Sequence, residues 1–431
     1  MNSTAAEKDN GKIELSEEEE SFAALGGDEE TTLSTLSFPP SNLANYSRKE
    51  KSSSISPRTL QFIRMHYPAV PLDDWNDWRW QIRNSITAID ELRQLIPLRE
   101  DEIHVLSTER DCLPFRITPY HASLVHPEDS HDPLRRILIP DVREFNRSAG
   151  EAEDPLNEDE MSPVPGIVHR YPDRVLFLTT DFCASNCRYC TRSRMVGRDE
   201  HCFTPKNWEL AFDYIRSHTE IRDVLLSGGD PLTLTDETLE YLLSKVREIP
   251  HVEIIRIGTR IPVVLPQRIT PKLMRIFRKH HPLWMNIHFS HPRELTQETS
   301  IALNRLADTG IPLGSQTVLL KGINDDADIL RELFLGLVKN RVRPYYLYQC
   351  DPILGSEHFR TPVDTGIEII SKLRGYNSGL AIPQYVIDAP GGGGKIPLQP
   401  DFLIDKGGGM VRLRNFKGGV SYYPDTSAPD T

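Results

Sequence analysis

Three cysteines stand within eight residues of this 431-residue chain, in the run CASNCRYC, as Cys183-x-x-x-Cys187-x-x-Cys190. Three thiolates without an obvious fourth ligand suit a cubane iron–sulfur cluster with one open iron, which can bind a substrate or a cosubstrate. Structural zinc usually takes four Cys or His ligands, and neither His169 nor Cys202 has a matching spacing. The motif therefore predicts a 4Fe-4S cluster that takes part in chemistry.

A glycine-rich run near the C-terminus, DAPGGGGK from Asp388 to Lys395, is the second candidate for chemistry. A phosphate loop needs Gly six residues before the Lys and Ser or Thr after it, whereas this chain has Ala389 and Ile396 there. The nucleotide interpretation therefore fails. Glycines let a backbone approach a flat ligand closely, and Lys395 could bond covalently to a carbonyl cofactor.

The elements that must position these residues form an alternating pattern. A β-rich run at residues 175–181 ends just before Cys183, and strand-like and helix-like runs alternate from Arg174 to about residue 375. About six such units predict an α/β fold in which parallel strands form a partial (β/α)6 barrel. Function is then expected at the C-terminal ends of the strands.

The flanking segments divide the chain further. Residues 1–30 carry ten acidic and two basic side chains, and with the Ser-rich stretch that follows they predict a disordered tail over residues 1–56. Apolar residues at helical spacing predict an N-terminal helical region over 57–165, in which the tryptophans Trp75, Trp78 and Trp80 anchor packing. The barrel is expected over 166–380, and a β-rich cap that carries Lys395 over 381–431.

Composition excludes several classes of protein. The net charge of −12 lies mostly in the acidic tail, and no basic stripe suggests nucleic acid binding. No apolar run is long enough to span a membrane, and the first residues lack a signal-peptide core. We therefore expect a cytoplasmic protein in which Cys112, Cys202 and Cys350 are ordinary thiols.

Several motifs together resemble a known family. Tyr189 gives the cysteine motif the form Cys-x-x-x-Cys-x-aromatic-Cys, and HRYPDRVL, SGGD, RIGTRIPVVLPQRIT and DAPGGGGK occur in one order along the chain. From about Asp74 to Tyr423 the sequence resembles the lysine 2,3-aminomutase family of radical S-adenosylmethionine enzymes. The resemblance implies the same partial barrel and three cofactors, namely the 4Fe-4S cluster, S-adenosylmethionine and pyridoxal 5'-phosphate.

The resemblance also implies roles for single residues. Lys395 would hold pyridoxal phosphate, with Arg170, Arg174 and Tyr171 as further contacts, although the two arginines could instead be ion-pair partners. Contacts with S-adenosylmethionine would come from the aromatic residue of the cysteine motif, from a Gly-Gly-Asp turn and from two polar residues on later strands. These residues are Tyr189, Gly228, Gly229, Asp230, His288 and Gln316. A plain turn for the glycines and a core position for the histidine remain open.

The expected substrate follows from charges at the two ends of the pocket. By resemblance Arg192 would bind an α-carboxylate, while Asp351 and Asp388 would hold the distal ammonium of lysine. Glutamate-acting relatives carry a lysine and an asparagine at those positions. Two carboxylates repel glutamate, so we expect a lysine 2,3-aminomutase, with arginine as a competing substrate. Asp351 as a strand-end cap and Asp388 as a turn residue are the structural alternatives.

Partners and alternatives complete the expectations. The resemblance implies an electron donor such as flavodoxin or ferredoxin, and the N-terminal helical region suggests a homo-oligomer. No cysteine follows Cys350, so the subunit-bridging zinc of clostridial relatives is not expected. A non-catalytic iron–sulfur redox sensor is the alternative from another class, but Lys395 would have no use there. The branch that modifies an elongation factor lacks the helical region and fits less well.

Overall fold

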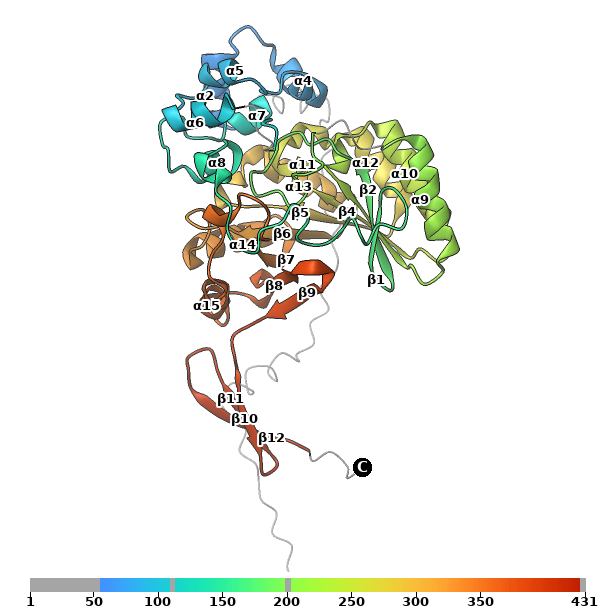
Figure 1. The fold of residues 1–431 in the computed structure, drawn as a ribbon, viewed down its shortest axis with the longest axis vertical. Helices are drawn as coiled ribbons and strands as arrows, with labels where there is room; N and C mark the ends of the chain where they lie inside the picture. Colours follow the sequence, from blue (N-terminus) through green and yellow to red (C-terminus); the bar gives the residue numbers. More distant parts are fainter. Residues whose placement is uncertain (1–54, 109–112, 198–202, 427–431) are drawn as a thin grey trace, which may run out of the picture. The chain divides into compact units, whose positions relative to one another are not determined.

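A computed structural model describes residues 55–108, 113–197 and 203–426, and Figure 1 shows its fold. Of the tail predicted for residues 1–56, residues 1–54 lie outside the described residues. Cys112 and Cys202 also lie outside them. Ile55 is buried, and the Ser56 hydroxyl caps the first described helix. The described fold therefore starts at the end of the predicted tail.

One nine-stranded sheet has its strands in sequence order, from β1 to β9. Its seven central strands pair in parallel, each with the next along the chain. They are β2 (Arg174–Thr180), β3 (Asp223–Gly228), β4 (Ile254–Thr259), β5 (Leu283–His288), β6 (Leu313–Leu319), β7 (Val342–Gln349) and β8 (Gln384–Ala389). Antiparallel β1 (Ile167–Tyr171) and β9 (Gly394–Leu398) form the two edges.

Helices connect the parallel strands and pack on the outside of the sheet (Figure 1). They are α9 (Pro205–Ser217), α10 (Asp236–Arg247), α12 (Pro271–Phe277), α13 (Gln297–Asp308), α14 (Ala327–Lys339) and α15 (Val363–Leu373). A Thr or Asp side chain caps the start of the first five, where it accepts a hydrogen bond from a backbone N–H of the first turn. Six helical crossovers between seven parallel strands confirm the predicted partial (β/α)6 barrel.

The N-terminal region is helical, but its helices are short. They are α2 (Pro57–His66), α3 (Leu72–Trp75), α4 (Trp78–Arg83), α5 (Ile89–Arg93), α6 (Glu100–Leu106), α7 (Pro119–Ala122) and α8 (Pro133–Leu138). The apolar pattern around Trp75 and Trp78 is continuous in the sequence, but α3 ends at Trp75 and a new helix begins at Trp78. The Asp77 side chain caps this new helix by accepting a hydrogen bond from Arg79 N at 3.0 Å. Trp75 and Trp78 are buried, which confirms their predicted packing role.

The core of this helical region continues into the loops at one end of the barrel. Buried side chains of the region, such as Tyr120, belong to the same apolar cluster as Leu320 and Cys350. Leu320 directly follows β6 and Cys350 directly follows β7. The helical region therefore packs against the C-terminal ends of the strands, where the active site is expected.

The C-terminal segment contains two kinds of strand. β8 and β9, which carry Asp388 and Lys395, belong to the barrel sheet. A separate three-stranded antiparallel sheet follows, made of β10 (Leu403–Gly407), β11 (Met410–Arg414) and β12 (Val420–Pro424). In the described part of the chain, no helix combines the length and the apolar character that a membrane span requires.

Candidate active site

The three cysteines of the motif lie on the loop that follows β2, and all three are free thiols. Hydrogen bonds tie this loop to the N-terminal region. Asn186 N donates to Arg116 O at 3.0 Å, and Arg188 N donates to Ile137 O at 3.0 Å. The buried Arg188 guanidinium also forms a bidentate pair with Glu144. The helical region therefore fixes the cluster loop at the barrel mouth.

The thiols are arranged to bind a cationic centre. Burial raises the pKa of Cys183 well above its usual value and that of Cys190 to about 11, and neighbouring thiols of the motif add to both shifts. Three thiolates so close together would repel one another unless a metal centre balanced their charge. Among the described residues, no three His, Cys, Asp or Glu side chains converge on a position for a single metal ion. The donor set fits a larger cluster held by three sulfurs.

Arg260 contacts the cluster loop but was missed in the sequence. It directly follows β4, and its guanidinium donates hydrogen bonds to Cys187 Sγ and, at 2.6 Å, to Glu294 Oε1. Both members of this ion pair are buried. A charged residue at the C-terminal end of a barrel strand is the signal that could have identified it.

The predicted Gly-Gly-Asp turn lies directly beside the start of the cluster loop. Gly228 has a φ of 126°, and a Cβ there would lie 2.1 Å from Thr180 O. Gly229 N donates to Thr180 O at 2.5 Å, so the end of β3 touches the backbone that leads to Cys183. Glycine is required for this close approach, which supports the structural alternative for these two residues.

Asp230 braces neighbouring strands in the described structure. Its carboxylate accepts hydrogen bonds from Thr259 Oγ1 at 2.6 Å and from Arg260 N at 2.7 Å. Burial raises the pKa of Asp230 to about 6, although these hydrogen bonds act in the opposite direction. Contact of this turn with a cosubstrate stays a prediction.

His288 and Gln316 are neighbours on adjacent strands. They are register partners between β5 and β6, and Gln316 Nε2 donates to the Tyr348 hydroxyl at 3.0 Å. Burial, together with the charges of Arg260 and Arg192, lowers the pKa of His288 to about 4. His288 is therefore a neutral imidazole at neutral pH, at the C-terminal end of β5.

Tyr189 packs in a buried cluster that Cys187 of the cluster loop also contacts. Its hydroxyl shares a hydrogen bond with Ser290 Oγ at 2.7 Å, and its ring lies edge-on to Phe359 with centroids 6.2 Å apart. The side chain is buried in the core of the helical region. The structure thus gives Tyr189 a packing role, and its contact with adenine stays a prediction.

The predicted pyridoxal phosphate residues meet at a seam between the two edges of the open sheet. Lys395 N on β9 donates to the Tyr171 hydroxyl on β1 at 2.9 Å. Lys395 Nζ donates to Asp388 Oδ2 at 2.9 Å, and Arg170 donates to Asp388 Oδ1 at 2.8 Å. Gly394 has a φ of 80°, and a Cβ there would lie 3.0 Å from the Tyr171 hydroxyl. The seam therefore brings together Lys395, Tyr171 and Arg170, as predicted.

The seam fits pyridoxal phosphate chemically. Lys395 supplies a primary amine for an aldehyde, and Arg170 Nε is a buried donor with no partner in the described part of the chain. Arg174 lies with its guanidinium 3.9 Å from the Tyr171 ring centroid and pairs with Asp173. An amine beside a guanidinium that has an unsatisfied donor can hold an aldehyde that carries a phosphate. Both arginines also make ion pairs, which agrees with the alternative that they are ion-pair partners.

Arg192 is held by a residue that sequence reasoning missed. Arg192 Nε donates to Glu158 Oε2 at 3.0 Å, and its NH2 group donates to Glu158 Oε1 at 2.7 Å. The Glu158 side chain is only 5% exposed. Burial raises its pKa, but the hydrogen bonds and charge of Arg192, with the charges of Arg194 and Arg170, together outweigh burial, and the pKa of Glu158 lies below its usual value. No motif or spacing in a single sequence points to Glu158.

Asp351 and Asp388 come together at the ends of β7 and β8. Thr191 Oγ1 donates to Asp351 Oδ2 at 3.0 Å, next to the cluster loop. Burial, and then the negative charge of Asp388, raise the pKa of Asp351 to about 7. Asp388 is already paired with Arg170 and Lys395. The two carboxylates are close, as predicted, and Asp351 is the one without a cationic hydrogen-bond partner among the described residues.

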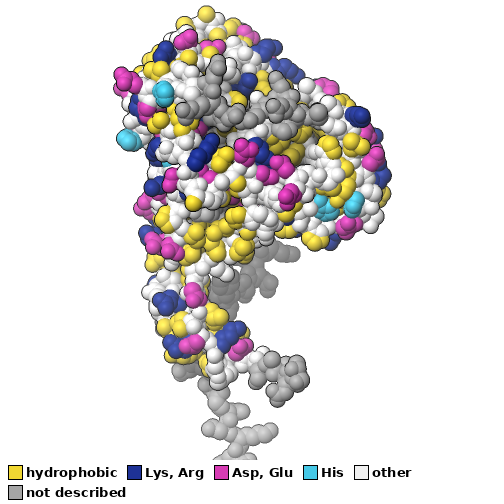
Figure 2. Space-filling model, in the orientation of Figure 1, with side chains coloured by type: hydrophobic (Ala, Val, Ile, Leu, Met, Phe, Trp, Pro, Cys, Tyr) yellow, Lys and Arg dark blue, Asp and Glu magenta, His cyan; other side chains and the backbone are white. Residues whose placement is uncertain are grey.

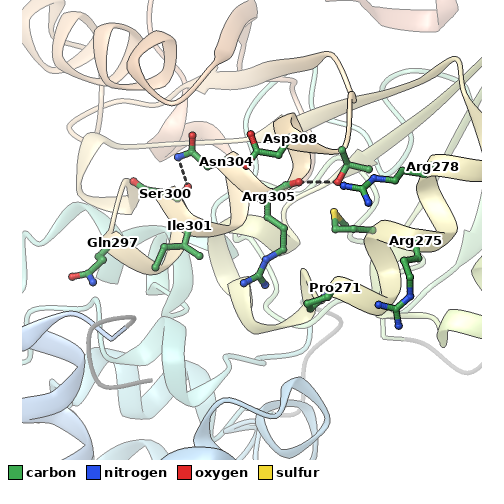
Figure 3. A pocket seen from close by; sticks show the side chains of 11 residues that line it. Pro271, Arg275, Arg278, Gln297, Ser300, Ile301, Asn304, Arg305 and Asp308 are labelled. Atoms are coloured by element: carbon green, nitrogen blue, oxygen red, sulfur yellow. Dashed lines mark hydrogen bonds between the residues drawn. The ribbon is translucent and has the colours of Figure 1, made fainter. Parts of the chain in front are cut away.

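A groove elsewhere on the molecule is not part of this site. It lies between α12 and α13, where Arg275, Arg278, Arg305 and Asp308 line it (Figure 3). It shares no residue with the cluster loop or the seam. The strand ends, and not this groove, therefore form the candidate active site.

Comparisons with known proteins agree with the site. The lysine-2,3-aminomutase family profile matches residues 370–430, and the radical SAM superfamily profile matches residues 177–333. An L-lysine 2,3-aminomutase of Clostridium subterminale is 54% identical over 352 residues, which cover 82% of this chain and 85% of that protein.

Two further relatives are named for different substrates, lysine and glutamate. An L-lysine 2,3-aminomutase of Acetoanaerobium sticklandii is 52% identical over 356 residues, which cover 83% of this chain and 86% of that protein. A glutamate 2,3-aminomutase of Clostridioides difficile is 44% identical over 358 residues, which cover 83% of this chain and 85% of that protein. The substrate must therefore be argued from the charges in the pocket.

Proposed function

This chain belongs to the lysine 2,3-aminomutase family of radical SAM enzymes, and from that premise we propose that it converts L-lysine to β-lysine. Family membership implies a 4Fe-4S cluster, S-adenosylmethionine and pyridoxal phosphate as cofactors. The observation that carries the choice of lysine is the pair of neighbouring carboxylates formed by the half-buried Asp351 and the buried Asp388. Such a pair stabilises a cationic side chain and repels glutamate.

Each residue has one task in this proposal. When bound, S-adenosylmethionine with the reduced cluster supplies a carbon-centred radical, and pyridoxal phosphate supplies a π-system that delocalises the unpaired electron. Lys395 would hold pyridoxal phosphate at the seam, where Asp388 orients its Nζ. Arg192 would bind the α-carboxylate and Asp351 the distal ammonium. Holding both ends fixes the β-carbon, and the helical region over the barrel mouth excludes water.

Anaerobic turnover tests the substrate directly. The reconstituted, reduced protein is incubated with S-adenosylmethionine, pyridoxal phosphate and either lysine, arginine or glutamate, and β-amino acids are separated by chromatography. We expect β-lysine as the main product. Formation of β-glutamate at a comparable rate would contradict the role of the carboxylate pair, whereas β-arginine would keep that role and change only which cationic substrate the pocket accepts.

Lysine binding should weaken as the pH falls through about 7. Asp351 has a pKa of about 7, so below that pH it takes up a proton and no longer offers a charge to the ammonium. The apparent Kd for lysine should then rise by up to about tenfold for each pH unit. Titration between about pH 6 and pH 8 measures this, with the visible absorption of bound pyridoxal phosphate as the signal. 2-Aminohexanoate, which lacks the ammonium, is the control and should show no such loss.

The C-terminal sheet supports self-association. All five residues of β12 are exposed, including Tyr422 and Tyr423 at 64% and 63%. Figure 2 shows hydrophobic side chains next to charged ones on this sheet. Exposed aromatic side chains on an edge strand are typical of an interface. We therefore propose a homo-oligomer. Its subunits would associate through this sheet, which is better supported as the interface than the helical region.

Light scattering after size-exclusion chromatography tests the oligomer. We expect a mass that is a multiple of 49.1 kDa for the wild-type protein. The double substitution Tyr422→Ser with Tyr423→Ser should lower the mass without changing the circular dichroism spectrum. A monomeric wild-type protein at micromolar concentration would contradict the proposal.

Two further roles belong to the same proposal. Reduction of the cluster needs a one-electron donor, and a small protein such as flavodoxin or ferredoxin would serve. A cluster with an open iron is sensitive to oxygen, so we propose the cytoplasm as its location, where thiols stay reduced.

A further inference from the structure

Glu158 lies on a segment, residues 151–161, that contacts most parts of the candidate site. The segment precedes β1 and contains neither a helix nor a strand. Pro155 O accepts a hydrogen bond from Gly391 N at 2.9 Å, on the loop before Lys395. Leu156 O accepts from the Arg170 guanidinium at 2.7 Å. The segment thus contacts both edges of the seam, at the loop before Lys395 and at Arg170 of β1.

The same segment also reaches the loops that carry the other site residues. Ala152 N donates to Pro352 O at 3.0 Å, next to Asp351. Asp154 and Asp159 both pair with Arg194 of the cluster loop, at 3.3 Å and 2.9 Å. Glu158 is therefore anchored on both sides by hydrogen bonds and ion pairs, and its carboxylate has a fixed position.

The geometry of the Arg192 pair leaves one side of the guanidinium available. A guanidinium has five N–H donors in a rigid fork and can bind two carboxylates along different edges. Glu158 occupies the edge formed by Nε and NH2. Among the described residues, the NH1 group donates a hydrogen bond only to Ser227 Oγ, and its length of 3.5 Å is long for a hydrogen bond. Ser227 lies near the end of β3, so the available edge faces the barrel mouth.

We propose that Glu158 is the positioning residue for the carboxylate end of the substrate. It holds Arg192 by one edge, so that the other edge is directed toward an α-carboxylate in the barrel mouth. Its negative charge also balances the half-buried Arg192 guanidinium when no substrate is bound. This inference rests on the proposed function, because it takes the substrate to be an α-amino acid.

Substrate analogues can isolate this role. In the protein loaded with pyridoxal phosphate, without reduction of the cluster, the visible absorption of the cofactor reports the binding of added amines. L-Lysine has the carboxylate, and 1,5-diaminopentane lacks only that group. Glu158→Gln should raise the Kd for lysine by about 10- to 100-fold, because the charge-assisted contact that fixes Arg192 is lost. The Kd for 1,5-diaminopentane should change by less than about twofold.

Two further variants separate positioning from stability. Glu102→Gln removes a matched buried partner, because Glu102 pairs with Arg135 through the same two-point contact far from the site. It should leave both Kd values unchanged. If Glu158 acts through Arg192, then Arg192→Lys should weaken lysine binding, and adding Glu158→Gln to it should cause no further loss. If Glu158→Gln does not fold, Glu158→Asp takes its place. Aspartate keeps the negative charge, but its side chain is one methylene shorter and would not reach Arg192 in the same geometry.

Three results would overturn the inference. In Glu158→Gln, the Kd could change equally for lysine and 1,5-diaminopentane, or it could stay the same for both. The third such result is that the variant binds lysine more tightly than the wild-type protein. The last would mean that Glu158 competes with the substrate for Arg192. A wild-type protein that forms no β-amino acid would instead contradict the proposed function, so the two failures are distinguishable.

Discussion

Replacing Lys395 by alanine should lower the rate of β-lysine formation at least ~1000-fold, because it removes the amine that would hold pyridoxal phosphate. Lys395 Nζ is the primary amine at the seam, and Asp388 fixes it at 2.9 Å. The substitution should also remove the visible absorption of the bound cofactor. Chromatographic assay of β-lysine and an absorption spectrum of the purified variant measure the two effects.

The cluster should survive this substitution. Lys395 lies on β9, and the cysteine loop follows β2, so the iron content and the cluster absorption should match those of the wild-type protein. Lys406→Ala on the exposed strand β10 removes a lysine from the same end of the chain, and we expect it to keep full activity. Wild-type rates in Lys395→Ala with added pyridoxal phosphate would contradict the assignment of Lys395.

The fold was predictable where local patterns report it. Each strand of a parallel sheet is buried by helices and therefore reads as a short β-rich run, and Thr or Asp residues mark the helix starts. The cluster loop was found because its three ligands lie within eight residues. The helical region was predicted with the right type but with helices too long, because the cap at Asp77 interrupts a continuous apolar pattern.

The parts that were not predictable depend on contacts between distant residues. Tyr171 and Lys395 are 224 positions apart, and only closure of the curved sheet brings their strands together. Glu158 has no regular element around it and no repeated spacing to other site residues. Its role follows only from the position of Arg192. Periodicity identifies elements, whereas a pairing across the barrel mouth depends on how those elements pack.

These distant contacts neutralise most of the charged groups of the pocket and leave one carboxylate without a cationic hydrogen-bond partner. Asp388 is neutralised by Arg170 and Lys395, and Arg192 is neutralised by Glu158. Asp351 is left with a hydroxyl as its hydrogen-bond partner among the described residues. A substrate with a distal ammonium would supply the missing charge. Asp351 is therefore the residue on which discrimination by side-chain charge depends most.

Asp351→Asn should lower kcat/KM for lysine by about 100- to 1000-fold. The amide keeps the shape of the side chain and a hydrogen bond to Thr191, but it removes the charge. A buried ion pair that loses one partner costs about 3–5 kcal/mol, because the other charge stays buried and uncompensated. Asp388 cannot replace it fully, since Arg170 and Lys395 already share that carboxylate. Anaerobic steady-state kinetics with lysine measure the loss.

The analogue without the ammonium decides whether the loss comes from charge. Binding of 2-aminohexanoate should change by less than about twofold in Asp351→Asn, because that ligand never used the carboxylate. The pH dependence of lysine binding near 7 should also disappear in this variant, since the group with the raised pKa is gone. Equal losses for both ligands would mean that Asp351 maintains the loop after β7 and does not bind substrate. A retained pH dependence would assign the titration to another group of the pocket, and the choice of lysine would then lose its main support.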